Sequence, residues 1–349
     1  MALGLIFLLA ALTASGPPSG DDAVCPAPAI QVLADGRART TLDVLTFNIE
    51  GLGWPARAHR EKQLAEIGAR LAALRQSGQA PDVILFQEAF SEAAKAAVRD
   101  TGYPAVVHGS RRGQHHRMPD DTEDLQGVEH GSIARGEIGL KLAGSGLAVA
   151  SRFPITSHTA KPFGSESCAG LDCLSNKGAL FARIAIPGVP DPVDVFDTHM
   201  NARRASKAPL SESLPVHHAE ARELATFIQT LRDEEHPTLL GGDFNIRHSE
   251  ARFGFLEPLM PLTLVERYCH DPAAGCEIRM SFDGDAPWLD TEDLQFFGSG
   301  RRVQVRPIRI ETLFDGRADS PRLSDHDGFR VTYELTWPAA LTTPTGACR

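Results

Sequence analysis

Several features that would assign the chain to a common class are missing from its sequence. The apolar run at residues 3–12 is broken by Ser-Gly-Pro-Pro and is too short to span a membrane, which takes roughly 18 or more apolar residues. The chain has neither a G-x-S-x-G nor a G-x-x-x-x-G-K-[ST] sequence, so a serine hydrolase and a P-loop nucleotide-binding protein both lack their motif. It also lacks internal repeats and any linker-like segment between residues 40 and 337. We therefore expect a single large domain over residues 38–337 and a C-terminal tail over residues 338–349.

Clustered positive charge is also scarce. The chain has 349 residues, with 35 Lys and Arg against 45 Asp and Glu, which gives a formal net charge of −10. Hydrophobic residues make up 42% and charged residues 23%, and this globular composition excludes a disordered, fibrous or coiled-coil chain. The acidic balance argues against wholesale binding of a phosphate backbone, because such binding takes clustered Lys and Arg. It still permits a small basic site on an acidic body.

The first twenty residues contain no Asp, Glu, Lys or Arg. Their apolar run has the length of the hydrophobic region of a signal peptide, and small residues suited to cleavage follow it. The absence of Lys or Arg before the run departs from the usual signal-peptide pattern. We expect a signal peptide over residues 1–20 and a secreted or periplasmic protein, and an uncleaved anchor is the alternative.

The chain has six cysteines, and in an exported protein paired thiols persist because the compartment is oxidising. Six cysteines allow fifteen connectivities. The simplest arrangement joins the two local pairs and the two ends of the mature chain, as Cys168–Cys173, Cys269–Cys276 and Cys25–Cys348. A zinc site is the alternative, but neither local pair is followed by a second pair at a matching spacing.

The first hundred residues predict alternating strands and helices. Residues 41–48 alternate and end in a polar residue, which is typical of a strand, and residues 60–75 carry apolar side chains at helical spacing. Residues 82–86 are apolar after the first and read as a buried strand. Ser91 caps a second helix that we expect to end near Gly102. This β-α-β-α opening favours a layered α/β fold.

The rest of the chain continues the pattern after a polar interruption. Residues 109–139 predict a long solvated surface loop, although its histidines leave a metal or ligand site as the alternative. Further strands are expected over residues 146–151, 178–186, 193–198, 238–242, 294–297 and 328–336, and a helix over residues 215–235 with Pro215 in its first turn. A basic stretch at residues 301–309 lies between the last two strands.

Polar side chains flank five of the predicted strands. They are Asn48, then Gln87 with Glu88, then the Asp-Thr-His-Met-Asn segment around His199, then Asp243 with Asn245, and finally Asp325 with His326. In open α/β sheets, ligands bind beyond the carboxyl ends of strands, so we expect these side chains to converge on one pocket. A single Glu after a strand is more often a surface or capping carboxylate. Five such groups in one chain argue for a site.

The residue types suit a divalent cation and a phosphodiester. Glu88, helped by Asn48, offers hard oxygen ligands to Mg²⁺, for which Mn²⁺ or Co²⁺ are plausible substitutes. A histidine near neutral pKa that a carboxylate orients can take the proton of an attacking water. His326, with Asp243 or Asp325 as its partner, is the candidate for this role.

The remaining polar residues suit the charge that develops on phosphorus. His199 can donate a hydrogen bond to the phosphoryl oxygens or to the leaving group, and Asn245 adds a neutral donor for the same charge. The chemistry that these residues predict is metal-assisted hydrolysis of a phosphate ester.

The segments LTFNIEGLG, DVILFQEAF, DTHMNA, GGDFNI and LSDHDGF, in this order over residues 45–329, resemble the endonuclease/exonuclease/phosphatase superfamily. The resemblance implies a deoxyribonuclease I-like four-layer α/β sandwich, in which two mixed β-sheets pack face to face between helices, and a Mg²⁺-dependent phosphodiesterase or phosphomonoesterase. It also implies the role of each residue: Glu88 carries metal, Asn48 and Asn245 bind phosphate, His199 stabilises the transition state, Asp243 orients or activates water, and His326 with Asp325 supplies the general base.

Residues 167–179 make the resemblance more specific within this superfamily. They are similar to a segment of secreted bacterial neutral sphingomyelinases in which an Asp is followed five residues later by Lys-Gly, and Asp172 and Lys177 match that pair. Residues 146–155 look like the strand and turn that precede it. The resemblance implies that the Asp–Lys pair lies near the active site and that phosphocholine is released from ceramide. The alternative for Lys177 is an ordinary lysine that enters a strand.

Two features depart from those sphingomyelinases. Residues 298–323 contain Phe314 as their only aromatic residue, where the family often carries an aromatic-rich hairpin, and offer arginines instead. Among three Trp and three Tyr, Trp54 and Trp288 are the candidates to hold a quaternary ammonium. We expect a monomer, without a protein partner, that contacts phospholipid at a membrane surface through the arginines or the 109–139 loop. A secreted deoxyribonuclease-like nuclease is the alternative, nucleic acid being less favoured, and a non-catalytic binding module is the third.

Overall fold

The computed structural model of the chain describes residues 27–53, 57–116, 141–280, 287–318 and 320–344. The predicted signal peptide, the predicted Cys25–Cys348 disulfide and most of the predicted 109–139 loop lie outside these residues. No helix within the described ranges is both long and apolar enough to cross a membrane.

The first sheet is built around β2 (Arg37–Asn48), whose side chains alternate between buried and partly exposed until the last five, which are all buried. Its strands follow the order β11-β13-β14-β2-β3-β5-β4, and β1 also pairs with β2. The other strands are β1 (Gln31–Val32), β3 (Val83–Gln87), β4 (Ala105–His108), β5 (Ala148–Ser151), β11 (Glu277–Arg279), β13 (Gln304–Leu313) and β14 (Gly328–Pro338). β2 and β3 are parallel and β14 is antiparallel to β2, so two strands end and one begins at the same edge.

The second sheet is built around the parallel pair β8 (Val193–His199) and β9 (Thr238–Asp243). Its order is β10-β12-β9-β8-β7-β6. The other strands are β6 (Ile155–Pro162), β7 (Gly178–Ile184), β10 (Thr263–Leu264) and β12 (Asp293–Gly298). β12 is antiparallel to β9, and Asp293 lies opposite Asp243. The carboxyl ends of β8 and β9 therefore meet the start of β12.

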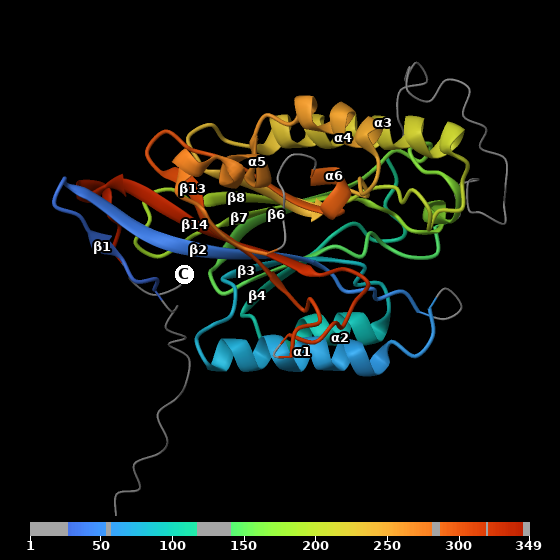
Figure 1. Ribbon diagram of the computed structural model, residues 1–349, viewed down its shortest axis with the longest axis horizontal. Helices are drawn as coiled ribbons and strands as arrows, with labels where there is room; N and C mark the ends of the chain where they lie inside the picture. Colours follow the sequence, from blue (N-terminus) through green and yellow to red (C-terminus); the bar gives the residue numbers. More distant parts are fainter. Residues whose placement is uncertain (1–26, 54–56, 117–140, 281–286, 319, 345–349) are drawn as a thin grey trace, which may run out of the picture.

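Helices cover the outer face of each sheet (Figure 1). α1 (Glu61–Gln76) and α2 (Glu92–Asp100) cover the first sheet, and α3 (Leu210–Leu231) and α4 (Glu250–Leu256) cover the second. The remaining helices, α5 (Val265–His270) and α6 (Pro287–Asp290), are short. One apolar core lies between the sheets, a second joins α3 and α4 to the second sheet, and a third joins α1 and α2 to the first. In α1, buried Leu64, Ile67 and Leu71 form the stripe that faces the sheet. This layering confirms the predicted α/β sandwich of two mixed sheets between helices.

Three elements differ from the prediction. β2 begins four residues earlier than residue 41, because Ala38 and Thr40 continue its inward-facing alternation. The predicted helix at residues 215–235 runs from Leu210 to Leu231, so Pro215 lies inside the helix rather than in its first turn. Most of the basic stretch is strand β13, whose alternation of buried and exposed residues places its arginines on the outside of the sheet.

The two local disulfides form as predicted. Cys168–Cys173 closes a loop around the short 3₁₀ helix η3 (Gly170–Leu174). Cys269–Cys276 joins the end of α5 to the residue before β11. A zinc site at these cysteines is therefore excluded, since all four sulfurs are bonded in pairs.

Candidate active site

Asn48 and Glu88 lie side by side at the ends of the parallel strands β2 and β3. Asn48 Nδ2 donates to Glu88 Oε1 at 3.2 Å and to Asp243 Oδ2 at 2.9 Å, so it links the two sheets. Glu88 Oε2 is buried and has no hydrogen-bond partner in the part of the chain that the structure describes. Burial raises the pKa of Glu88 to about 7, against the opposing effect of Lys177. A buried, unpartnered carboxylate oxygen fits a cation ligand.

Asp243 and His199 end the neighbouring strands β9 and β8, where they are paired in register. Gly242 lets the strands approach, because a Cβ there would lie 2.2 Å from the Thr198 carbonyl oxygen and its φ is +149°. His199 Nε2 is 3.3 Å from Asp243 Oδ2. Burial, reinforced by the positive charges of Lys177 and His326, lowers the pKa of His199 well below its usual value. His199 is therefore a neutral imidazole beside a carboxylate.

Asn245 follows β9, and the backbone there turns back toward the Asp243 carboxylate. Its backbone N–H donates to Asp243 Oδ1 at 2.9 Å, and its Nδ2 donates to the Met200 carbonyl oxygen at 2.9 Å. A positive φ of 51° at Asn245 makes this turn possible. The side chain thus lies between the ends of β8 and β9, next to the Asp243 carboxylate, and its amide oxygen has no hydrogen-bond partner among the described residues.

His326 precedes β14 and donates its Nδ1 hydrogen to Asp293 Oδ2 at 2.7 Å. The predicted partner Asp325 is not in that position, which corrects the sequence-based assignment. Its side chain is 51% exposed and lies 3.4 Å from Arg57. The turn itself is fixed by Ser324 Oγ, which donates to the Asn48 carbonyl oxygen at 2.7 Å. Asp293, which begins β12, is therefore the group that orients His326.

Carboxylates surround His326. Its Nε2 lies 3.6 Å from Glu292 Oε2 and 3.8 Å from Asp243 Oδ2. Burial alone would lower the pKa of His326, but Asp293, Asp243 and Glu292 raise it well above its usual value. The ligand atoms of Asp243, Glu292 and His326 lie within 4.8 Å of one another and form a second donor set that suits a metal ion. Sequence reasoning found Glu88 and Asn48 but missed Glu292 in this role.

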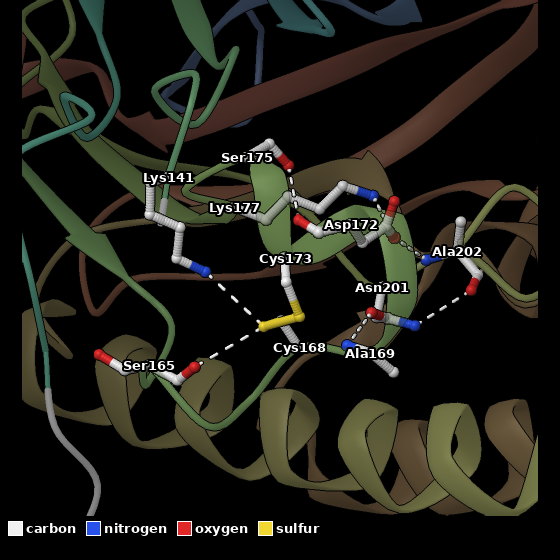
Figure 2. The surroundings of a disulfide bond; sticks show 10 residues. All are labelled: Lys141, Ser165, Cys168, Ala169, Asp172, Cys173, Ser175, Lys177, Asn201 and Ala202. Carbon is white, nitrogen blue, oxygen red and sulfur yellow. Dashed lines mark hydrogen bonds and ion pairs between the residues drawn. A yellow bond between two sulfur atoms is a disulfide. The ribbon is translucent and has the colours of Figure 1, made fainter. Parts of the chain in front are cut away.

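Asp172 and Lys177 form an ion pair at the same cavity (Figure 2). Lys177 Nζ donates to Asp172 Oδ2 and to the Met200 carbonyl oxygen, both at 2.9 Å. Asp172 also accepts a hydrogen bond from the Ala202 backbone N–H. Burial would lower the pKa of Lys177, but the carboxylates of Asp172 and Asp243 raise it. Lys177 is thus a fixed positive charge next to the loop that follows β8.

These groups surround one cavity of about 1170 Å³. The predicted residues that line it are Glu88, Asp172, Lys177, His199, Asp243, Asn245, Asp325 and His326. Asn48 lies just behind its wall, 1% exposed, and holds Glu88 and Asp243. The cavity therefore gathers every residue that the sequence assigned to the site, and adds Glu292 to its lining and Asp293 behind it.

The predicted arginine contacts lie elsewhere. Arg306 pairs across from Glu334 in the half of β14 that is remote from His326. The four arginines are held in ion pairs: Arg301 with Glu235, Arg302 with Asp191, Arg306 with Glu334, and Arg309 with Glu311 and Asp43. Arg301, Arg302 and Arg306 lie toward the opposite end of the strands, and Arg309 lies in the middle of β13. Trp54 and the side chain of Trp288 lie outside the described residues.

Comparisons with known proteins agree with this geometry. The chain matches the endonuclease/exonuclease/phosphatase family over residues 45–326. Its sequence matches no curated protein. The fold is similar to that of a Staphylococcus aureus beta toxin double mutant with bound magnesium ions, at 17% identity and a TM-score of 0.57 over 84% of this chain and 99% of that chain.

Two further structures share the fold. Sphingomyelinase C from Streptomyces griseocarneus is 20% identical, with a TM-score of 0.57 over 84% of this chain and 99% of that chain. D. rerio TDP2 in complex with a single-stranded DNA product is 14% identical, with a TM-score of 0.54 over 84% of this chain and 98% of that chain. The family match spans most of the chain and includes the carboxylate and histidine set described above. The chain therefore belongs to the endonuclease/exonuclease/phosphatase family, with the site of a phosphodiesterase.

Proposed function

We propose that the protein is a Mg²⁺-dependent phospholipid phosphodiesterase that cleaves sphingomyelin to ceramide and phosphocholine. The observation that carries the proposal is the Asp172–Lys177 ion pair on the wall of the cavity that also holds Glu88 and both histidines. A buried lysine paired at 2.9 Å is held where it can meet a phosphoryl oxygen beside the metal ligand. Sphingomyelinase C, which has the same fold, supports the choice of substrate.

His326 suits the role of the general base. Its Nδ1–H is donated to Asp293, so the ring can accept a proton only at Nε2, and that atom faces the cavity beside Glu292. When a water attacks phosphorus, the new P–O bond forms as its proton passes to Nε2, the P–O bond to the leaving group breaks, and the leaving alkoxide takes a proton from solvent to become the alcohol. Asp293 stabilises the imidazolium that results, because the two groups share a 2.7 Å charge-assisted hydrogen bond.

His199 and Lys177 suit the opposite task of meeting negative charge. The low pKa of His199 keeps it neutral, so it can donate one hydrogen bond to a phosphoryl oxygen or to the leaving group. Lys177 carries a permanent charge that is fixed by two hydrogen bonds at 2.9 Å. Both groups are pre-oriented before substrate binds, which is the condition for stabilising a transition state rather than the ground state.

Glu88, Asp243 and Glu292 are the carboxylates that would hold Mg²⁺, with Mn²⁺ or Co²⁺ as substitutes, and this leaves His326 Nε2 free to accept a proton. A bound divalent cation supplies positive charge to the phosphoryl oxygens, and the same charge offsets the carboxylates that raise the pKa of His326. The buried Glu88 carboxylate, with a pKa raised to about 7, is ionised more fully when a positive charge lies beside it.

We propose that the protein acts outside the cytoplasm, as a monomer at a membrane surface. The two disulfides suit an oxidising compartment, since paired thiols persist there. Their presence supports the export that the N-terminal sequence predicts.

Three substrates distinguish the proposal from its alternatives. The purified protein is given sphingomyelin vesicles, phosphatidylcholine vesicles or plasmid DNA, each with Mg²⁺ and with EDTA. We expect phosphocholine release from sphingomyelin with Mg²⁺ and none with EDTA. Nicked DNA with intact lipid would instead identify a nuclease, and no hydrolysis of any of the three would favour a binding module.

A further inference from the structure

Four cationic side chains line the active-site cavity without any role in the chemistry above. Arg203, Arg204 and Lys207 lie in the loop between β8 and α3, and Arg247 follows Asn245 after β9. No hydrogen bond or ion pair joins these four side chains to any other residue that the structure describes. Arg203 Nε is even buried without a partner. The arginines of residues 301–309 are, by contrast, all paired.

The loop that carries three of these charges is held firmly. The Ser206 carbonyl oxygen accepts from the Leu171 N–H at 2.7 Å, and Asn201 Oδ1 accepts from the Ala169 N–H at 2.9 Å. Both donors lie in the loop that the Cys168–Cys173 disulfide closes (Figure 2). The charges are therefore presented by an ordered segment, and only their long side chains are free to move.

Exposed apolar side chains accompany the charges. Leu142 lines the cavity and is 57% exposed, although its backbone N–H is fixed by the Leu174 carbonyl oxygen at 2.6 Å. Leu210 begins α3 three residues after Lys207 and is 59% exposed. Exposed leucines beside unpaired cations match the boundary between lipid headgroups and acyl chains. Nucleic acid offers no comparable apolar surface to these leucines.

We propose that the cavity mouth formed by Arg203, Arg204, Lys207, Arg247 and Leu142 binds an anionic phospholipid headgroup next to the substrate lipid. The proposal rests on the phospholipid substrate proposed above and adds that the membrane must carry negative charge for tight binding. The phosphate or carboxylate of the anionic lipid meets the cations, and the leucine enters the interfacial region. The arrangement turns the open side of the active site toward the membrane.

The test measures binding without turnover. The full-length protein in EDTA is sedimented with vesicles of phosphatidylcholine alone or of phosphatidylcholine mixed with phosphatidylserine. We expect tighter binding to the mixed vesicles, and weakening of that binding by added salt. Each near-surface cation contributes about fivefold in affinity, so the Arg204→Gln/Lys207→Gln variant should bind mixed vesicles about 25-fold more weakly.

A matched variant removes the same charge from the other end of the molecule. Arg37→Gln/Arg301→Gln replaces two exposed arginines near the start of β2 and before β13, and should bind like the wild type. Leu142→Asn should weaken binding to both kinds of vesicle, because the apolar contribution does not depend on lipid charge. Thermal melting checks that each variant is folded.

Two results would overturn the proposal. One is equal binding of the wild type to both kinds of vesicle. The other is loss of plasmid binding, but not of vesicle binding, in the Arg204→Gln/Lys207→Gln variant, which would assign the cations to nucleic acid. Because binding is measured in EDTA, these outcomes are separate from a failure to release phosphocholine, which would count against the proposed function alone.

Discussion

Replacing Asp293 with asparagine tests the assignment of the catalytic histidine most directly. Asp293 is buried, its carboxylate accepts from His326 Nδ1 at 2.7 Å, and burial raises its pKa to about 6. Asparagine keeps the shape but removes the negative charge that orients and stabilises a protonated ring. Since general acid–base catalysis typically contributes about 10²–10⁴-fold, we expect Asp293→Asn to lower kcat by a factor in that range.

The stability of the Asp293→Asn variant should change much less than its rate. A carboxyl whose pKa is raised on folding destabilises the folded state above its folded pKa, here above about pH 6, and the penalty disappears as the pH falls toward 3.8. Asparagine removes this penalty at neutral pH but also removes the charge that stabilises protonated His326, so we expect only a small change in thermal stability. A large loss of activity in a protein that melts near the wild-type temperature would separate catalysis from folding.

The matched control is Asp325→Asn, which changes the residue next to His326. The Asp325 side chain is 51% exposed and its nearest ion-pair partner is Arg57 at 3.4 Å, so we expect close to the wild-type rate. Histidine NMR titration of the metal-free protein adds a second readout. His326 should titrate well above 6.5 in the wild type and lower in Asp293→Asn, because Asp293 is the largest contributor that raises its pKa. Equal losses of activity in the two variants would refute the reasoning.

The remaining predictions concern metal, packing and the disulfide. Glu88→Gln should shift the Mg²⁺ concentration for half-maximal activity upward, and an unchanged Mg²⁺ titration would remove Glu88 from the metal site. Arg252→Met should lower the free energy of unfolding by about 3 kcal/mol or more in urea, because buried Arg252 donates to the carbonyl oxygens of Asn201, Asn245 and Ser213, and a stability like that of the wild type would contradict this role. Cys173→Ser should lower the free energy of unfolding by about 2 kcal/mol, because the unfolded chain is no longer constrained by the short loop that the Cys168–Cys173 disulfide closes. Urea unfolding of the variant and of the wild type, both under non-reducing conditions, measures this difference.

The sequence predicts those site residues whose position follows from local pattern. Asn48 and Asp243 each end an apolar strand, so the end of the pattern marks the residue. The same pattern does not identify Asp293, although its strand was predicted. Asp293 reaches the site only because β12 pairs antiparallel with β9, which places it opposite Asp243, fifty residues earlier in the chain. The assignment of Asp325 failed for a different reason. The Asp325 side chain lies beside Arg57, and the carboxylate that contacts His326 comes from Asp293, 33 residues earlier in the chain.

The sequence predicted the location of free positive charge least well. Arg306 lies in a basic stretch of sequence, yet Glu334 on the neighbouring strand neutralises it at 2.8 Å. Arg204 and Lys207 have no such partner among the described residues, although nothing in the net charge of −10 marks them. A charged side chain can bind a ligand only if the fold places no oppositely charged side chain next to it. Which side chains become neighbours depends on contacts between residues that are far apart in the sequence.

The order of strands in the first sheet also sets when the protein can become active. β14 lies between β13 and β2 and is the last strand among the described residues, and His326 precedes it. Until β14 inserts, β2 lacks one neighbour and His326 is not brought to Asp293. While β14 is unpaired, the ends of β8 and β9 can already lie together, but His326 is not held beside Asp243. Completion of the site therefore depends on a strand near the end of the described residues.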